Sequence, residues 1–91
     1  MQRTALVTGA TAGFGAAICR TLIKNGYHVI GTGRRIARLE QLQQELGKNF
    51  HFLAFDISDR QATEDAFHSL PANWQSIDLL VNNAGLGLGL E

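Results

Sequence analysis

Short apolar runs alternate with longer amphipathic segments along this chain. The first run, at residues 3–8, has a continuous apolar centre, which is typical of strands buried on both faces of a parallel sheet. The runs predict strands over residues 3–8, 27–32, 50–55 and 77–82. Between them, apolar residues recur at the three- and four-residue spacing of a helix. These segments predict helices over residues 13–25, 35–46 and 59–70.

Local signals mark the ends of these helices. The pair Asn25-Gly26 is expected to stop the first helix, and Gly47 to cap the C-terminus of the second. Ser58 and Gln61 have the spacing of a capping box, which predicts that Ser58 starts the third helix.

The alternation of strands and helices indicates stacked βαβ units. Right-handed crossovers then give one parallel sheet with strand order 3-2-1-4 and a switch point beside the first strand. The predicted fold class is α/β, a Rossmann-type doubly wound parallel sheet, and residues 1–91 are expected to form its N-terminal βαβαβαβ part. Ligands bind such sheets at the switch point, beyond the carboxyl ends of the strands.

A glycine-rich turn lies at that switch point. It runs Gly9-Ala10-Thr11-Ala12-Gly13-Phe14-Gly15, between the first strand and the first helix. Glycines let a ligand approach the main chain closely, and a helix N-terminus favours an anion through its free N–H groups and its dipole. We therefore expect these residues to bind the diphosphate of a dinucleotide. The alternative is a tight turn without a ligand, although three glycines in one turn cost chain entropy.

A second motif, Asn82-Asn83-Ala84-Gly85, follows the fourth predicted strand. Together with Thr8-Gly9-x-x-x-Gly13-x-Gly15, it resembles the motifs of the short-chain dehydrogenase/reductase family, and the resemblance extends over essentially the whole chain. It implies an oxidoreductase that transfers hydride between a nicotinamide cofactor and an alcohol or carbonyl. It also implies a small-molecule substrate and a homo-oligomeric parent protein, a dimer or a tetramer.

The end of the second strand bears on the choice of cofactor. Dinucleotide folds place a carboxylate there to bind the ribose hydroxyls of NAD, or an arginine to accommodate the 2′-phosphate of NADP. Gly33 occupies the acidic position, and Arg34 and Arg35 follow at once. Guanidinium groups bind phosphate through paired, charge-assisted hydrogen bonds. The expected cofactor is therefore NADP, and the alternative is that both arginines are solvated at the start of a helix.

The family resemblance implies further cofactor contacts from the third and fourth strands. The Asp56 carboxylate would meet the adenine amino group and the N–H of Ile57 the adenine ring; otherwise Asp56 would serve the turn into the third helix. Asn83 would contact the cofactor while Asn82 supports the neighbouring strand, unless both residues serve only turn chemistry.

The family's catalytic motif, Tyr-x-x-x-Lys preceded by a serine, does not occur in this chain. Its one tyrosine, Tyr27, is followed four positions later by Gly31, and Lys24 and Lys48 are placed at helix ends. No catalytic residue is therefore expected here, and the simplest expectation is the N-terminal fragment of a longer enzyme, whose last strand would expose an edge. The glycine-rich tail, residues 85–90, is expected to form a loop.

Composition adds a few exclusions. The formal net charge is zero, so nothing indicates nucleic acid as a partner, and no apolar run has the length of a membrane helix. The single cysteine, Cys19, cannot form an internal disulfide; it is expected to be buried, in a protein of the reducing cytoplasm. His28, His51 and His68 have no metal-ligand spacing, so no metal is expected.

Within the family, Phe14 in the glycine motif and the segments Gly33-Arg34-Arg35 and Asn83-Ala84-Gly85-Leu86 are similar to bacterial NADP-dependent 3-hydroxy acid dehydrogenases. Two other functions stay open. One is a non-catalytic NADP-binding sensor or regulatory module. The other is a different Rossmann-type protein, such as a methyltransferase, although that class usually has an acidic residue near the end of the second strand.

Overall fold

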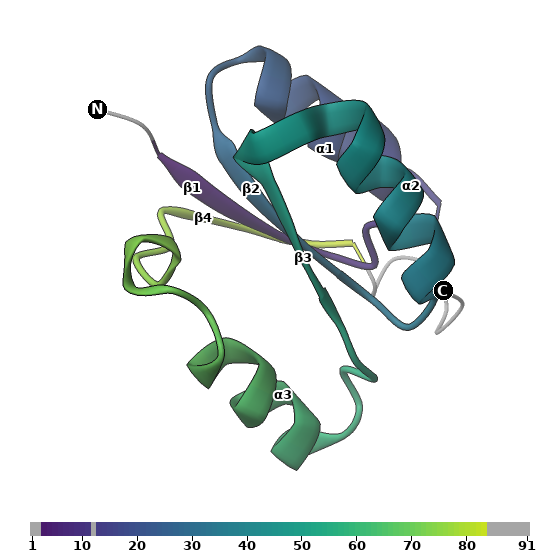
Figure 1. The fold of residues 1–91 in the computed structure, drawn as a ribbon, viewed down its shortest axis with the longest axis vertical. Helices are drawn as coiled ribbons and strands as arrows, with labels where there is room; N and C mark the ends of the chain where they lie inside the picture. The colour runs from purple at the N-terminus through teal and green to yellow at the C-terminus, as the bar shows by residue number, and fades with distance from the viewer. Residues whose placement is uncertain (1–2, 12, 84–91) are drawn as a thin grey trace.

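The computed structural model describes residues 3–11 and 13–83 of the chain. The strands are β1 (Thr4–Thr8), β2 (His28–Gly33), β3 (Phe50–Ala54) and β4 (Leu79–Asn82). The helices are α1 (Gly15–Lys24), α2 (Ile36–Leu46) and α3 (Arg60–His68), with 3-10 turns at Gly47–Asn49 and Ala72–Trp74. All pairings are parallel and the strand order is β3-β2-β1-β4 (Figure 1), which confirms the predicted fold class and order.

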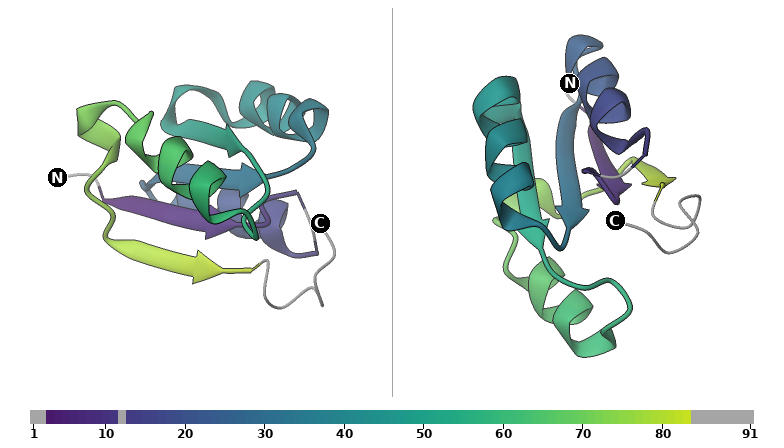
Figure 2. Two further views of the ribbon diagram at one scale, coloured as in Figure 1. Left: turned by 90° about the horizontal axis from the view of Figure 1, so that it is seen from below. Right: turned by 90° about the vertical axis from the view of Figure 1, so that its right-hand side faces the viewer.

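Helices cover both faces of the sheet. Helices α1 and α2 lie together against one face, and α3 lies on the other (Figures 1 and 2). Successive residues of a strand point to opposite faces, so neighbours such as Leu6 and Val7 enter different cores. The core beneath α1 and α2 contains Val7, Ala10, Cys19, Val29, Leu39, Leu42 and Phe50. The core beneath α3 contains Leu6, Ile30, Leu53 and Leu70.

The two strands at the centre of the sheet are buried, and β4 is not. Every residue of β1 is buried, whereas Leu80 in β4 is 61% exposed and Leu79 is 37% exposed. Strand β4 pairs with β1, with Thr8 opposite Asn82. Among the described residues nothing pairs with its other edge. The register brings the carboxyl end of β4 beside the turn that follows β1.

Several predicted boundaries are wrong by one or two residues, for identifiable reasons. Helix α1 begins at Gly15 rather than at residue 13, because Gly13 has a φ of +53°, in the left-handed region that a right-handed helix excludes. Tyr27 does not start the second strand. Its N–H bonds to the carbonyl of Leu22 at 3.0 Å, as part of the end of α1, and β2 begins at His28.

The predicted capping box at Ser58 is also wrong. The N-cap of α3 is Asp59, whose carboxylate accepts a hydrogen bond from the N–H of Ala62 at 3.0 Å. The Ser58 hydroxyl instead donates to Asp56 Oδ1 at 2.7 Å. A carboxylate at the N-cap can also interact with the helix dipole. Ser58 and Asp59 are adjacent residues of types that cap helices, and Asp59 is the one that caps α3.

The start of β4 lies later than predicted. Residues 77 and 78 precede the strand, and Asp78 is tied to the start of β1 by two hydrogen bonds. Its carboxylate accepts from the N–H of Thr4 at 2.9 Å, and its own N–H donates to the Thr4 carbonyl at 2.8 Å. A side chain thus takes the place of one rung of the ladder between the two strands.

Aromatic and sulfur side chains have packing roles in this fold. Trp74 lies between His28 on β2 and His51 on β3, with ring centroids 5.1 and 5.4 Å away. Cys19 is fully buried, as expected, and burial raises the pKa of its thiol to about 12. In residues 3–11 and 13–83, no cluster of His, Cys, Asp or Glu could hold a metal ion. No helix in these ranges is long and apolar enough to cross a bilayer.

Candidate functional site

The carboxyl ends of all four strands meet at one edge of the sheet (Figure 2). The glycine turn follows β1, Arg34 follows β2, Asp56 follows β3 and Asn83 follows β4. Segments separated by most of the chain are therefore neighbours here, as the parallel topology requires. This edge contains every described residue that the sequence singled out for cofactor binding. Ala12 and residues 84–91, including the predicted tail loop, lie outside the described residues.

Within the glycine turn, the main chain at Gly15 lies very close to the main chain at Gly9 and Ala10. Gly9 and Gly13 have φ values of +62° and +53°, which L-residues other than glycine rarely adopt. Gly15 has no such φ, but a Cβ atom on it would collide with the carbonyl oxygen of Gly9. The N–H of Ala10 donates to the Thr32 carbonyl at 2.8 Å, which ties the turn to β2. The three glycines of the motif thus serve two needs: positive φ and the absence of a side chain.

Gly31, within β2, packs against this turn, and its sequence context did not single it out. A Cβ atom on Gly31 would lie 2.7 Å from the Phe50 ring and 2.8 Å from the Cβ of Ala10. Ala10, fully buried, occupies the space that a side chain at position 31 would need. The available signal was a glycine inside an apolar strand, which often marks a close backbone or side-chain approach.

The two asparagines at the end of β4 hold the turn in place. Thr8 Oγ1 donates to Asn82 Oδ1 at 3.1 Å, which confirms that Asn82 supports the neighbouring strand. Asn83 is buried, and its Nδ2 donates to the carbonyl oxygen of Gly9 at 2.9 Å. The contact of Asn83 seen here is therefore with the turn itself. The same Gly9 oxygen is the atom that excludes a side chain at Gly15.

The first turn of α1 has the properties of an anion site. Its N-cap, Phe14, makes no side-chain capping bond, and the side chain of Phe14 is 75% exposed. The first N–H groups of any helix have no intrahelical partner, and the first turn of α1 contains no acidic residue. These groups face the glycine turn, where the dipole favours negative charge.

The positive charges follow β2. Arg34 and Arg35 are exposed, and Arg35 is the N-cap of α2 in an extended conformation with no side-chain capping bond. On β3, hydrogen bonds from the Ser58 hydroxyl and N–H hold the pKa of Asp56 below its usual range, and the positive charge of Arg34 adds to this effect. Asp56 therefore does serve the turn into α3, and Arg34 lies near enough to influence its charge. The next residue, Ile57, is 39% exposed.

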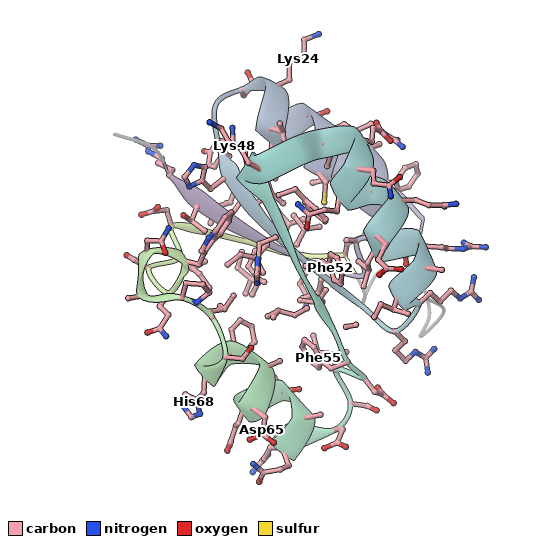
Figure 3. The ribbon with its side chains drawn as sticks, viewed as in Figure 1. Lys24, Lys48, Phe52, Phe55, Asp65 and His68 are labelled. Carbon is pink, nitrogen blue, oxygen red and sulfur yellow. The ribbon has the colours of Figure 1, made fainter. Side chains whose placement is uncertain are left out.

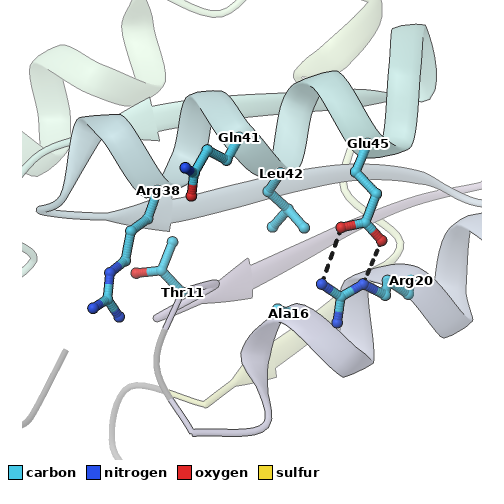
Figure 4. Close-up of a pocket in the computed structure, with 7 residues that line it drawn as sticks. All are labelled: Thr11, Ala16, Arg20, Arg38, Gln41, Leu42 and Glu45. Atoms are coloured by element: carbon cyan, nitrogen blue, oxygen red, sulfur yellow. Dashed lines mark hydrogen bonds and ion pairs between the residues drawn. The ribbon is translucent and has the colours of Figure 1, made fainter.

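A surface pocket of about 430 Å³ opens between α1 and α2 (Figure 4). It is lined by Thr11, Ala16, Arg20, Arg38, Gln41, Leu42 and Glu45. Arg20 and Glu45 form a two-bond ion pair across it, with Arg20 Nη2 3.0 Å from Glu45 Oε1. Thr11 Oγ1 is buried and has no hydrogen-bond partner within the described residues. Of these residues, only Thr11 was singled out from the sequence as a site residue.

The two lysines lie away from this edge. Lys24 ends α1 and Lys48 precedes β3. Both sit at the end of the molecule where β2 and β3 begin (Figure 3), opposite the glycine turn. Tyr27 lies at the same end of β2. The described residues thus place no tyrosine–lysine pair beside the candidate site.

Comparison with known proteins identifies the group to which this architecture belongs. The profile of the family described as short chain dehydrogenase matches residues 3–90. The chain is 67% identical over 88 residues to a probable NADP-dependent dehydrogenase of Haemophilus influenzae, a match that covers 97% of this chain and 35% of that protein. It is 56% identical over 86 residues to the NADP-dependent 3-hydroxy acid dehydrogenase YdfG of Escherichia coli O6:H1, covering 94% of this chain and 35% of the relative.

A solved structure has the same fold. The closed form of serine dehydrogenase complexed with NADP+ superposes with a TM-score of 0.85 at 52% identity, covering 88% of this chain and 32% of that one. The chain thus spans about a third of the length of the curated relatives and of this structure.

Proposed function

The chain belongs to the short chain dehydrogenase family, and we propose that residues 1–91 form the NADP-binding N-terminal part of a single Rossmann domain in an NADP-dependent oxidoreductase. The observation that carries the proposal is the turn between β1 and α1. There Gly15 approaches the Gly9 carbonyl too closely for any side chain. Such a bare main-chain surface at a helix N-terminus fits a diphosphate. The named relatives, two of which are called NADP-dependent, support the same cofactor.

The residues present fit NADP in two further respects. Thr11 Oγ1 is a buried polar atom in the turn without a partner among the described residues, and α1 lacks both a side-chain cap and an acidic first turn. In this proposal the diphosphate lies against the main chain of the turn. The residues concerned are Gly9, Ala10, Thr11, Ala12, Gly13, Phe14 and Gly15.

The adenosine end of the cofactor is assigned to the ends of β2 and β3. Arg34 and Arg35 would bind the 2′-phosphate, because Gly33 leaves no carboxylate to repel it. Asp56 and the N–H of Ile57 would meet the adenine ring. Asn83, whose amide bonds the Gly9 carbonyl, would act on the cofactor through the shape of the turn as well as by contact.

The bound cofactor would supply or accept hydride at its nicotinamide ring, on an alcohol or carbonyl substrate. A 3-hydroxy acid is the proposed substrate class. The name of the Escherichia coli relative and the serine dehydrogenase title of the matching structure support it. The proposed partners are this small molecule and further copies of the same protein.

Titration of the whole protein with NADPH and with NADH tests the cofactor assignment. The double variant Arg34→Ala with Arg35→Ala should weaken NADPH binding far more than NADH binding. Each lost charge-assisted contact is worth about 1.5–3 kcal/mol, or roughly tenfold to a hundredfold in affinity. Lys24→Ala with Lys48→Ala removes the same charge from the opposite end of the molecule and should leave both affinities unchanged. Equal losses for the two nucleotides in the arginine variant would reject the 2′-phosphate assignment.

A second measurement separates catalysis from binding alone. The whole protein should produce NADPH from NADP+ when a 3-hydroxy acid such as serine is added. Gly9→Val should abolish nucleotide binding, because its side chain would enter the space assigned to the diphosphate and its φ is strained. Tight NADPH binding without turnover of any 3-hydroxy acid would instead favour the non-catalytic binding module.

A further inference from the structure

One face of α2 carries polar side chains toward α1. Arg38, Gln41 and Glu45 stand at positions i, i+3 and i+7, so they share a face of the helix. They line the pocket between the two helices together with Ala16 and Arg20 of α1. Leu39, which lies one position after Arg38, is fully buried against the sheet. The orientation of α2 therefore follows from its buried leucines, and it places the exposed Arg38 along the lining of the pocket.

The two cations that line this pocket, Arg20 and Arg38, differ in whether an opposite charge lies beside them. Arg20 is neutralised by a bidentate ion pair with Glu45, and this interaction holds the pKa of Glu45 below its usual range. The guanidinium of Arg38 has no hydrogen bond or ion pair within the described part of the chain. It lies in the first turn of α2, which contains no acidic residue. A cation at a helix N-terminus is unfavourable unless an anion accompanies it.

Thr11 connects this pocket to the position that distinguishes the two nicotinamide cofactors. Its Oγ1 lies 3.5 Å from the point that a Cβ atom on Gly33 would occupy. Position 33 is where a carboxylate would bind the ribose hydroxyls of NAD. Figure 4 shows Thr11 at the same end of the pocket as Arg38 and Gln41, with the Arg20–Glu45 pair at the other end. The space freed by Gly33 is thus bordered by a hydroxyl group that lines the same pocket as Arg38.

We propose that Arg38 and Thr11 form part of the 2′-phosphate site, with Arg38 as a further specificity-determining cation beside Arg34 and Arg35. The phosphate would accept hydrogen bonds from the Arg38 guanidinium and from the buried Thr11 hydroxyl. The bound phosphate would place a negative charge beside Arg38 and give the Thr11 hydroxyl a hydrogen-bond acceptor. This inference rests on the proposed function, because it concerns the same cofactor.

The experiment compares two ligands that differ only in the phosphate concerned, adenosine 2′,5′-bisphosphate and adenosine 5′-monophosphate, by calorimetric titration of the whole protein. Arg38→Gln should weaken binding of the bisphosphate about tenfold and leave the monophosphate unchanged, since one charge-assisted bond is lost. Lys24→Gln is the control. It removes the same charge from an exposed site at the far end of α1 and should change neither affinity.

Thr11→Val supplies an independent test. It replaces a buried hydroxyl that has no partner among the described residues with a methyl group of similar size, so the urea midpoint of the protein without ligand should stay or rise. Affinity for the bisphosphate should nevertheless fall severalfold, and that for the monophosphate should not. A purely structural role for Thr11 would not separate the two ligands.

The outcomes distinguish this inference from the proposed function. If Arg38→Gln and Thr11→Val leave the ratio of the two affinities unchanged while Arg34→Ala with Arg35→Ala lowers it, the assignment of Arg38 and Thr11 is wrong and the NADP assignment stands. If the unsubstituted protein binds both ligands equally, no 2′-phosphate site exists and both proposals fail.

Discussion

The side-chain amide of Asn83 donates a hydrogen bond to the carbonyl oxygen of Gly9, 74 positions earlier in the chain, at 2.9 Å. The last described residue thus fixes the first residue of the glycine turn. Gly9 has a φ of +62°, so its carbonyl points where the regular ladder of β1 would not place it. A buried side chain satisfies that oxygen instead. The conformation of the proposed diphosphate site therefore depends on the end of β4.

Asn83→Ala should destabilise the protein by about 1–3 kcal/mol, because it leaves a buried carbonyl oxygen without a donor. It should also weaken NADPH and NADH binding by the same factor, since the turn is the proposed site of the diphosphate that both share. Urea unfolding and nucleotide titration measure the two effects. Asn73→Ala, at an exposed position in the 3-10 turn Ala72–Trp74, is the matched control. A loss confined to NADPH would contradict this role.

Gly15→Ala should cost more stability than Gly26→Ala, although only Gly26 has a positive φ. A methyl group at Gly15 would collide with the Gly9 carbonyl and lie 2.9 Å from Ala10, whereas nothing lies within 4 Å of the corresponding point at Gly26. Backbone strain at Gly26 is worth about 1–2 kcal/mol, and a main-chain collision exceeds it. Thermal unfolding of the two variants decides the order. Similar melting temperatures would mean that the turn can widen to accept a side chain.

Asp59 and Ser58 are adjacent at the start of α3, so their contributions to stability can be compared directly. Asp59→Ala should destabilise the protein by about 0.5–2 kcal/mol, because it removes the cap on the N–H of Ala62. Ser58→Ala removes only an exposed hydrogen bond to Asp56 and should cost less. Chemical denaturation of the two variants measures the difference. The reverse order would restore Ser58 as the cap that the capping-box spacing predicted.

Topology was predictable from the sequence because it depends on repeated, redundant signals. Four apolar runs, three amphipathic segments and right-handed crossovers admit few arrangements, and the strand order β3-β2-β1-β4 followed. The strand order also determines the position of the glycine turn, because the turn comes directly after β1. Cys19 was correctly placed in the core because it shares the buried face of an amphipathic helix.

Local boundaries and the pocket between the helices were not predictable in the same way. The choice of Asp59 over Ser58 as N-cap rests on the direction in which the chain leaves β3, which periodicity does not contain. Tyr27 has the character of a strand residue, but its N–H donates to the Leu22 carbonyl at the end of α1. Arg38 and Thr11 line one pocket because of the way α2 packs beside α1. Only a three-dimensional arrangement brings these residues, distant in sequence, together.

Acid should destabilise the protein partly through His51. Burial against Trp74 holds the pKa of His51 below its ordinary value of 6.5, so the folded protein favours the neutral ring. The unfolded chain binds its proton first as the pH falls, and the contribution to stability is full above 6.5 and lost below it. Urea unfolding at stepwise lower pH should show this decline. In His51→Phe that part of the decline should disappear, and an unchanged profile would contradict the assignment.

Alkali should also destabilise the protein, in this case through Cys19. Burial raises the pKa of its thiol from 9.0 to about 12, so the folded protein keeps the thiol neutral while the unfolded chain ionises it. The unfolded state therefore binds fewer protons between these two values, and stability falls as the pH rises through this window, by up to about 1.4 kcal/mol per pH unit. Cys19→Ala lacks the titrating group, so its unfolding free energy should decline less over the same interval. It should also be less stable than the unsubstituted protein at neutral pH, because it leaves a small cavity. Parallel denaturation curves for the two proteins across this interval would show that the thiol ionises in the folded state as readily as in the unfolded chain.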